Sequence, residues 1–250
     1  MKARKVCLIL SVVFIILGCG LLGYLVKDYS TAKGVSIKGN MVLKEFGISK
    51  NQDKKDTQQQ TEEGVSDDNL LGMLQSSFQN EDVVGYVLFE EAGISYPVLQ
   101  GTDNEEYMRK DIYGNVSVCG SIFLDYENAS DFSDVSSILY GHHMRNGSMF
   151  GSLEKSLSNG WGGKKFYIYS RDKKLTYDIV SAKPVQPDLR GKYLVKDEAG
   201  LGDFINELKT GVYKESGNKE NFVTLLTCHY VNRSTIRYAV TGCLSAEEEY

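Results

Sequence analysis

The stretch Asn221–Leu244, NFVTLLTCHYVNRSTIRYAVTGCL, holds two short runs rich in Val, Leu, Thr and Tyr on either side of a polar segment. Such residues favour β-strands, and a segment with Asn and Ser favours a turn between them. The stretch therefore predicts an antiparallel hairpin. In this hairpin Cys228 ends the first strand, Arg233 falls in the turn, and Arg237 begins the second strand close to Cys228.

Similar strand-like runs recur upstream, at residues 83–91, 94–100, 120–126, 136–143, 164–170 and 174–185. Eight strands separated by turn residues are typical of a closed barrel or a sandwich. Three segments have a helical pattern instead: 70–79, 147–157 and 201–213. In the first, Asp68 or Asn69 supplies an N-cap, and Leu70, Leu74 and Phe78 share one face. The sequence thus predicts a mostly β fold with helices.

Composition narrows the class of protein. The chain has 250 residues, of which 42% are hydrophobic, and its net charge is −5. That length allows one substantial domain with attachments. The negative charge argues against a nucleic-acid-binding protein. The 25 glycines are scattered, and no phosphate-binding loop or internal repeat is evident.

The N-terminus indicates a membrane anchor. MKARK is followed by Val6–Val26, a run of 21 residues without a charge. About 20 apolar residues cross a bilayer as a helix. The basic flank favours the cytoplasm, so the rest of the chain is expected outside. The alternatives are a buried core helix and a lipoprotein cleavage box, ILGC, ending at Cys19. Because the apolar run continues past Cys19, we favour an uncleaved anchor.

A polar spacer follows. Ser49–Asn69 carries almost no apolar residue and cannot bury enough surface to offset the entropy of ordering. We therefore divide the chain into residues 1–27, a cytoplasmic N-terminus with a transmembrane anchor, residues 28–66, an extracellular stalk, and residues 67–250, the globular domain. Within the stalk, MVLKEFGI has helical character, but the sequence does not place it.

Five cysteines are present, and two of them, Cys7 and Cys19, lie in the apolar run. The remaining three, Cys119, Cys228 and Cys243, are an odd number, which indicates a free thiol in an exported domain. The predicted hairpin separates Cys228 from Cys243 by a stagger of about six residues, or roughly 20 Å. A disulfide needs Cα atoms within about 7 Å. Cys228 is therefore expected not to pair with Cys243.

Two of the three histidines, His142 and His143, end a predicted strand. Neighbouring strand residues point to opposite faces, so only one of the two is expected to reach a given site. A Cys, a His and an Arg at strand ends form a candidate cysteine-nucleophile site. The alternatives are unrelated surface and core residues, or a metal site formed by His142, His143, His229 and Cys228. The spacing of that set matches no common zinc pattern.

The motifs also resemble a known family. TLLTC, ending at Cys228, resembles the TLxTC signature of sortases, the cysteine transpeptidases of Gram-positive cell surfaces. EDVVGYVLFEEAGISYPVLQGTDNEEYM, GSIFLDYEN and DFSDVSSILYGHHMRNGSMFGSL precede it in the order of class B sortases. The order His, Cys, Arg differs from that of papain-like enzymes. One departure is Leu226, where many class B members have Ser.

This resemblance implies an eight-stranded sortase-type closed β-barrel with an N-terminal helix and a helix before the cysteine strand. It implies that Cys228 is the nucleophile, that His142 is the catalytic histidine and that Arg237 is the catalytic arginine. It also places Thr227, Leu226 and Tyr140 against the substrate. No cofactor and no metal are expected. The site would belong to an enzyme on the outer face of the cell membrane, held there by one span.

The implied reaction begins with cleavage of a sorting signal after its Thr. A thioester acyl-enzyme passes the acyl group to an amine of a peptidoglycan precursor or of a pilin lysine. The expected partners are surface proteins that carry sorting signals. Two alternatives remain: a non-catalytic binding module on the same fold, and a surface cysteine protease. The preferred signal is not readable, although the segment between residues 185 and 221 is expected to help select it.

Overall fold

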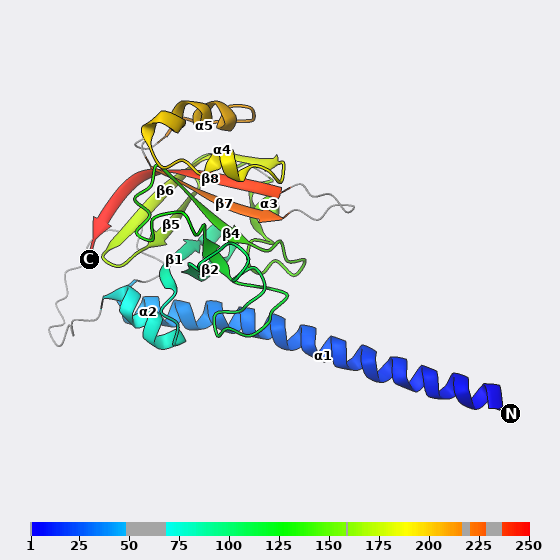
Figure 1. Ribbon diagram of the computed structural model, residues 1–250. Helices are drawn as coiled ribbons and strands as arrows, with labels where there is room; N and C mark the ends of the chain where they lie inside the picture. The colour runs from blue at the N-terminus through cyan, green and yellow to red at the C-terminus, as the bar shows by residue number, and fades with distance from the viewer. Residues whose placement is uncertain (1, 49–68, 159, 217–220, 229–236) are drawn as a thin grey trace.

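The computed structural model describes residues 2–48, 69–158, 160–216, 221–228 and 237–250. Within them, eight strands close into a barrel in the order β1-β2-β3-β4-β7-β8-β6-β5 (Figure 1). The strands are β1 Val83–Phe89, β2 Ile94–Leu99, β3 Ile122–Leu124, β4 Ser136–Gly141, β5 Lys165–Tyr169, β6 Lys173–Val185, β7 Phe222–Cys228 and β8 Arg237–Glu249. Each coincides with one predicted run, and of the two predicted architectures the barrel is confirmed.

Strand direction decides what meets at each end of the barrel. The pairs β2–β3 and β4–β7 are parallel, whereas the other neighbours are antiparallel. Because β4 and β7 are parallel, their carboxyl ends lie at the same edge. The antiparallel partner β8 starts at that edge. The end of β4 is thus brought to the end of β7 and the start of β8, which lie far from it in the sequence.

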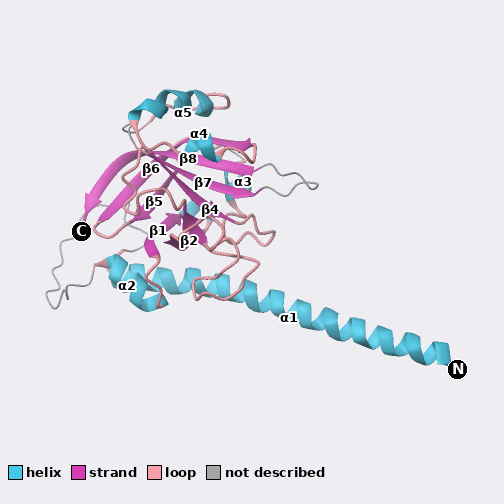
Figure 2. Ribbon diagram, viewed as in Figure 1, coloured by secondary structure: helices cyan, strands magenta, loops and turns pink. Residues whose placement is uncertain are grey.

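Two apolar clusters hold the fold together. The larger contains buried residues from all eight strands and extends to the helices next to β1 and β2. The smaller lies on the outer side of β4, β7 and β8, where the segment between β6 and β7 packs. That segment contains α4 Arg190–Tyr193, the short helix η2 Glu198–Gly200 and α5 Leu201–Leu208 (Figure 2). Phe204 and Leu208 of α5 are buried in this cluster, as their spacing predicts.

The remaining short helices are α2 Leu70–Phe78, α3 Leu153–Leu157 and η1 Glu90–Ala92. Asn69 caps α2, because the backbone N–H of Gly72 donates to its side-chain oxygen at 2.8 Å. Leu70, Leu74 and Phe78 are buried, which confirms the predicted apolar face.

The longest helix, α1, spans Lys2–Glu45 and leaves the barrel as a long arm (Figure 1). In the part of the chain that the structure describes, it is the one helix long and apolar enough to cross a membrane. The predicted span Val6–Val26 lies wholly within it. The length and composition of this helix are compatible with a single-pass membrane anchor.

The structure differs from the predicted stalk over residues 28–45. These residues continue α1 and pack against the barrel through Ala32, Val35, Val42 and Leu43, all of which are buried. Their spacing forms one apolar stripe on the helix, which polar neighbours obscured in the sequence. This part of the chain belongs with the folded domain. The predicted spacer Ser49–Asn69 falls almost entirely outside the described residues.

Candidate active site

The three candidate catalytic residues occupy neighbouring strand ends. The backbone of Cys228, the last residue of β7, pairs with Arg237, the first residue of β8. On the other side of β7, Thr227 pairs with Gly141, and His142 follows Gly141 directly. The register therefore places positions 142, 228 and 237 side by side at one edge of the barrel. The predicted hairpin accounts for the pairing of 228 with 237, and the pairing of β4 with β7 adds position 142.

The predicted stagger of the cysteines is confirmed as well. Cys243 pairs with Phe222, six residues before Cys228. Cys119 and Cys243 are both buried and unbridged. Burial and the neighbouring Asp28 carboxylate raise the pKa of the Cys119 thiol to about 12, so this thiol stays protonated at neutral pH. Cys119 is accordingly a poor nucleophile.

His142 is held in place by a backbone carbonyl. Its Nε2 lies 2.7 Å from the carbonyl oxygen of Met108 in the β2–β3 connection. A carbonyl oxygen only accepts, so Nε2 carries a proton in this arrangement and the ring orientation is fixed. Sequence reasoning did not find Met108, because a main-chain oxygen leaves no signal in residue types.

Gly120 makes this arrangement possible. Its φ is +56°, and a Cβ at this position would lie 2.6 Å from the Met108 carbonyl oxygen and 3.1 Å from the His142 ring. Any side chain here would therefore displace the carbonyl that orients His142.

The two adjacent histidines share one pocket, which differs from the prediction. His142 and His143 both line an open pocket together with Met108, Arg109 and Arg145. The reason is that β4 ends at Gly141, so strand alternation no longer separates the side chains that follow it. His142 nevertheless remains the residue bonded to Met108.

Arg237 is half-buried, and its positive charge acts on Tyr140 of β4. Burial and the nearby Asp125 carboxylate raise the pKa of Tyr140, while the positive charges of Arg190 and Arg237 act in the opposite direction. The Tyr140 hydroxyl donates to Asp125 at 2.8 Å, and its ring stacks on Phe123. Tyr140 is thus fixed between the two clusters, next to the candidate arginine.

Asp125 is the centre of a polar network that sequence reasoning missed. Its carboxylate is fully buried and accepts from Arg190 Nε at 2.7 Å and from Arg190 Nη2 at 2.8 Å. Burial raises the pKa of Asp125, but hydrogen bonds from Arg190, the Glu127 backbone, Tyr140 and Asn104 outweigh it and leave this pKa below its ordinary value. The network fastens α4 beside the site.

Two of the predicted substrate contacts are interior residues. Leu226 and Thr227 are each about 1% exposed, and Leu226 packs in the smaller cluster beneath α5. Tyr140 is the accessible member of the predicted trio. The side chain of Cys228, His229 and Arg233, which the sequence predicts to lie in the turn, are outside the described part of the structure, and with them two of the four residues of the alternative metal set.

The known proteins that this chain resembles are sortases. The family model of the sortase domain matches residues 89–245 of this chain. Sortase B of Listeria monocytogenes is 33% identical over 162 residues, which cover 60% of this chain and 63% of that protein.

Two solved structures share the fold. Sortase B of Clostridium perfringens is 27% identical with a TM-score of 0.60, over 67% of this chain and 97% of its own. A class B sortase of Streptococcus pyogenes, involved in pilus biogenesis, is 30% identical with a TM-score of 0.54, over 65% and 92%.

The family model covers well over half of the chain, so this protein belongs to the sortase family. Within that family, the curated relative and the similar structures identify it as a class B sortase.

Proposed function

We propose that this chain is a membrane-anchored cysteine transpeptidase that cleaves a sorting signal after its Thr and joins the new carboxyl end to an amine. The observation that carries the proposal is the register of β4, β7 and β8. It brings positions 142, 228 and 237 together.

Each residue has a distinct role in the proposed reaction. The Cys228 thiolate attacks the carbonyl of the Thr, and the bond to the following residue breaks. His142 donates the proton that the departing amine requires. Arg237 donates charge-assisted hydrogen bonds to the oxyanion that develops during attack, or to the substrate backbone. An incoming amine then displaces Cys228 from the thioester. No cofactor takes part in these steps.

The proposed partners follow from this chemistry. The acyl donor is a surface protein with a sorting signal, and the acceptor is an amine of a peptidoglycan precursor or a pilin lysine. The similarity to the Streptococcus pyogenes class B sortase, which is involved in pilus biogenesis, supports a pilin lysine as the acceptor. With α1 as a single span, the barrel would lie on the extracellular side.

The test is a peptide-ligation assay with product mass spectrometry. Peptides carrying Asn-Pro-X-Thr-Asn-like or Leu-Pro-X-Thr-Gly-like signals are incubated with the purified chain, with and without an amine panel. We expect slow hydrolysis alone and a ligated product when a suitable amine is present. Cys228→Ala should abolish both products, whereas the buried control Cys243→Ala should retain them.

The alternatives give different results. Hydrolysis without ligation across the whole amine panel would favour a surface cysteine protease. Absence of cleavage, together with no alkylation of Cys228 by a thiol reagent, would favour a binding module on the sortase fold.

A further inference from the structure

The loop between β2 and β3 is fastened to α1 at the level where the proposed span ends. The Tyr24 hydroxyl donates to the carbonyl oxygen of Val116 at 3.1 Å. Tyr24 lies two residues before Val26, the last residue of the uncharged run, or about 3 Å along the helix axis. In the bilayer, tyrosine is typical of this interfacial level.

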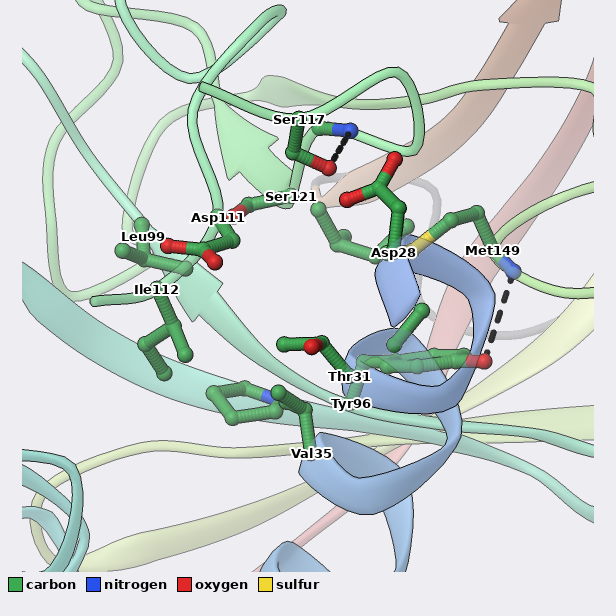
Figure 3. Close-up of a pocket in the computed structure, with 14 residues that line it drawn as sticks. Asp28, Thr31, Val35, Tyr96, Leu99, Asp111, Ile112, Ser117, Ser121 and Met149 are labelled. Atoms are coloured by element: carbon green, nitrogen blue, oxygen red, sulfur yellow. Dashed lines mark hydrogen bonds between the residues drawn. The ribbon is translucent and has the colours of Figure 1, made fainter. Parts of the chain in front are cut away.

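A buried carboxylate fixes the loop at that height. Asp28, one helical turn after Tyr24, is 7% exposed and accepts from the backbone N–H of Val118 at 2.8 Å and of Cys119 at 3.2 Å. Figure 3 shows the Asp28 carboxylate pointing from α1 toward the loop that carries Ser117. A charged, buried acceptor of two backbone donors is costly to separate, so helix and loop should move as one body.

The loop is also ordered internally. The Asp111 carboxylate accepts from the backbone N–H groups of Tyr113 and Asn115, and Lys110 pairs with Val116 in an antiparallel bridge. Its shape is therefore set before any partner arrives.

This fixed loop presents apolar side chains to the outside. Val116 is 77% exposed, more than the exposed large hydrophobic residues in the described part of α1, and Val118, two residues later, is also exposed. Water contact at such apolar positions is unfavourable. Because this exposed valine is held by Tyr24 beside the outer end of the proposed span, its position favours contact with the bilayer.

We propose that the loop segment 115–118 is a second membrane contact, in which Val116 enters the interfacial layer of phospholipid beside the outer end of α1. The inference rests on the proposed membrane anchoring of the chain. The pocket beside His142 is lined by Tyr29 of α1, by Val118 of the loop and by the exposed Arg109 and Arg145. The candidate active site would consequently open at the level of the lipid headgroups, with cationic side chains toward anionic phosphates.

The test places a single tryptophan at the loop. The full chain, with its only tryptophan removed by Trp161→Phe, is reconstituted into phosphatidylcholine vesicles that carry bromine near the top of the acyl chains. Val116→Trp is compared with Val212→Trp, a 70% exposed control that lies just after α5. Interfacial groups enter roughly 5–10 Å into the headgroup and acyl boundary, so bromine should quench Val116→Trp at least about twofold more than the control.

Flotation of the vesicles shows whether the chain is bound to the membrane at all, and so tests the proposed anchor separately from the proposed contact of the loop. Quenching confined to Val116→Trp in floating protein supports the proposal. Equal quenching of the two tryptophans in floating protein would overturn it. Another protein would then be the partner that contacts the loop. Failure of the chain to float would overturn the anchor and this inference together. If Trp161→Phe unfolds, the same pair is compared with Trp161 present and its constant signal subtracted.

Discussion

At the scale of single residues, His142 and Arg237 reach the candidate site by different means. His142 follows the end of β4, and its orientation depends on the Met108 carbonyl rather than on the strand. Arg237 is the first residue of β8, so pairing with Cys228 fixes its backbone. A nearby residue of the same type serves as the matched control in each case: His143 for His142, and Arg233 for Arg237.

His142→Ala should lower the rate of peptide cleavage by about 10²–10⁴-fold, because it removes the proposed leaving-group acid. His143→Ala, which lines the same pocket without the bond to Met108, should lose much less. Turnover of one sorting peptide by both folded variants is the measurement. Equal losses would show that both histidines take part.

Arg237→Ala should cost about 10²–10³-fold in turnover, the usual effect of removing one oxyanion donor. Arg237→Lys should restore only part of it, because lysine lacks the planar pair of donors. Arg233→Ala, four residues earlier, should have a small effect. Near-normal turnover by Arg237→Ala beside a collapse in Arg233→Ala would move the role to Arg233.

At the scale of elements, the strands were predictable because each is a local run of β-favouring residues between turns. The second half of α1 and the position of α4 were not. Both depend on contacts between residues far apart in the sequence. Val35 of α1 packs in the apolar core of the barrel, and Arg190 of α4 forms an ion pair with Asp125. The pairing of Asp125 with Arg190 joins positions 65 residues apart, and nothing in either local sequence indicates it.

Arg190→Gln tests whether that pair fastens α4. Removing one partner of a buried pair costs about 3–5 kcal/mol, and since Arg190 itself is partly exposed we expect about 2 kcal/mol in the free energy of unfolding. Lys192→Gln, on the same helix and paired with Glu207 at the surface, should change stability little. Urea unfolding at pH 7 compares them. Equal losses would contradict a special role for Asp125.

The same pair should give stability a pH dependence. Because the pKa of Asp125 is lowered in the folded chain, its contribution is fully present above the ordinary aspartate pKa of about 4 and is lost as pH falls through the folded value. The difference between wild type and Arg190→Gln should therefore shrink in acid. A difference that stays constant from pH 7 to the acid limit would exclude this linkage.

At the scale of the whole molecule, closure of the barrel brings the candidate site together. The sequence motifs suggested which residues belong to it, and the hairpin between Cys228 and Arg237 followed from their spacing. The parallel pairing of β4 with β7 did not, because no local pattern specifies which strands become neighbours. That pairing is what places His142 beside the other two positions.

In the proposed reaction, Cys228 carries the acyl group between donor and acceptor. The most direct measurement is the intact mass of the enzyme after brief mixing with a sorting peptide, followed by mapping of the modified residue. We predict an added mass equal to the peptide fragment ending in Thr, located on Cys228, removed by an amine and absent from Cys228→Ala. An adduct on another residue, or equal cleavage by Cys228→Ala, would contradict this role of Cys228.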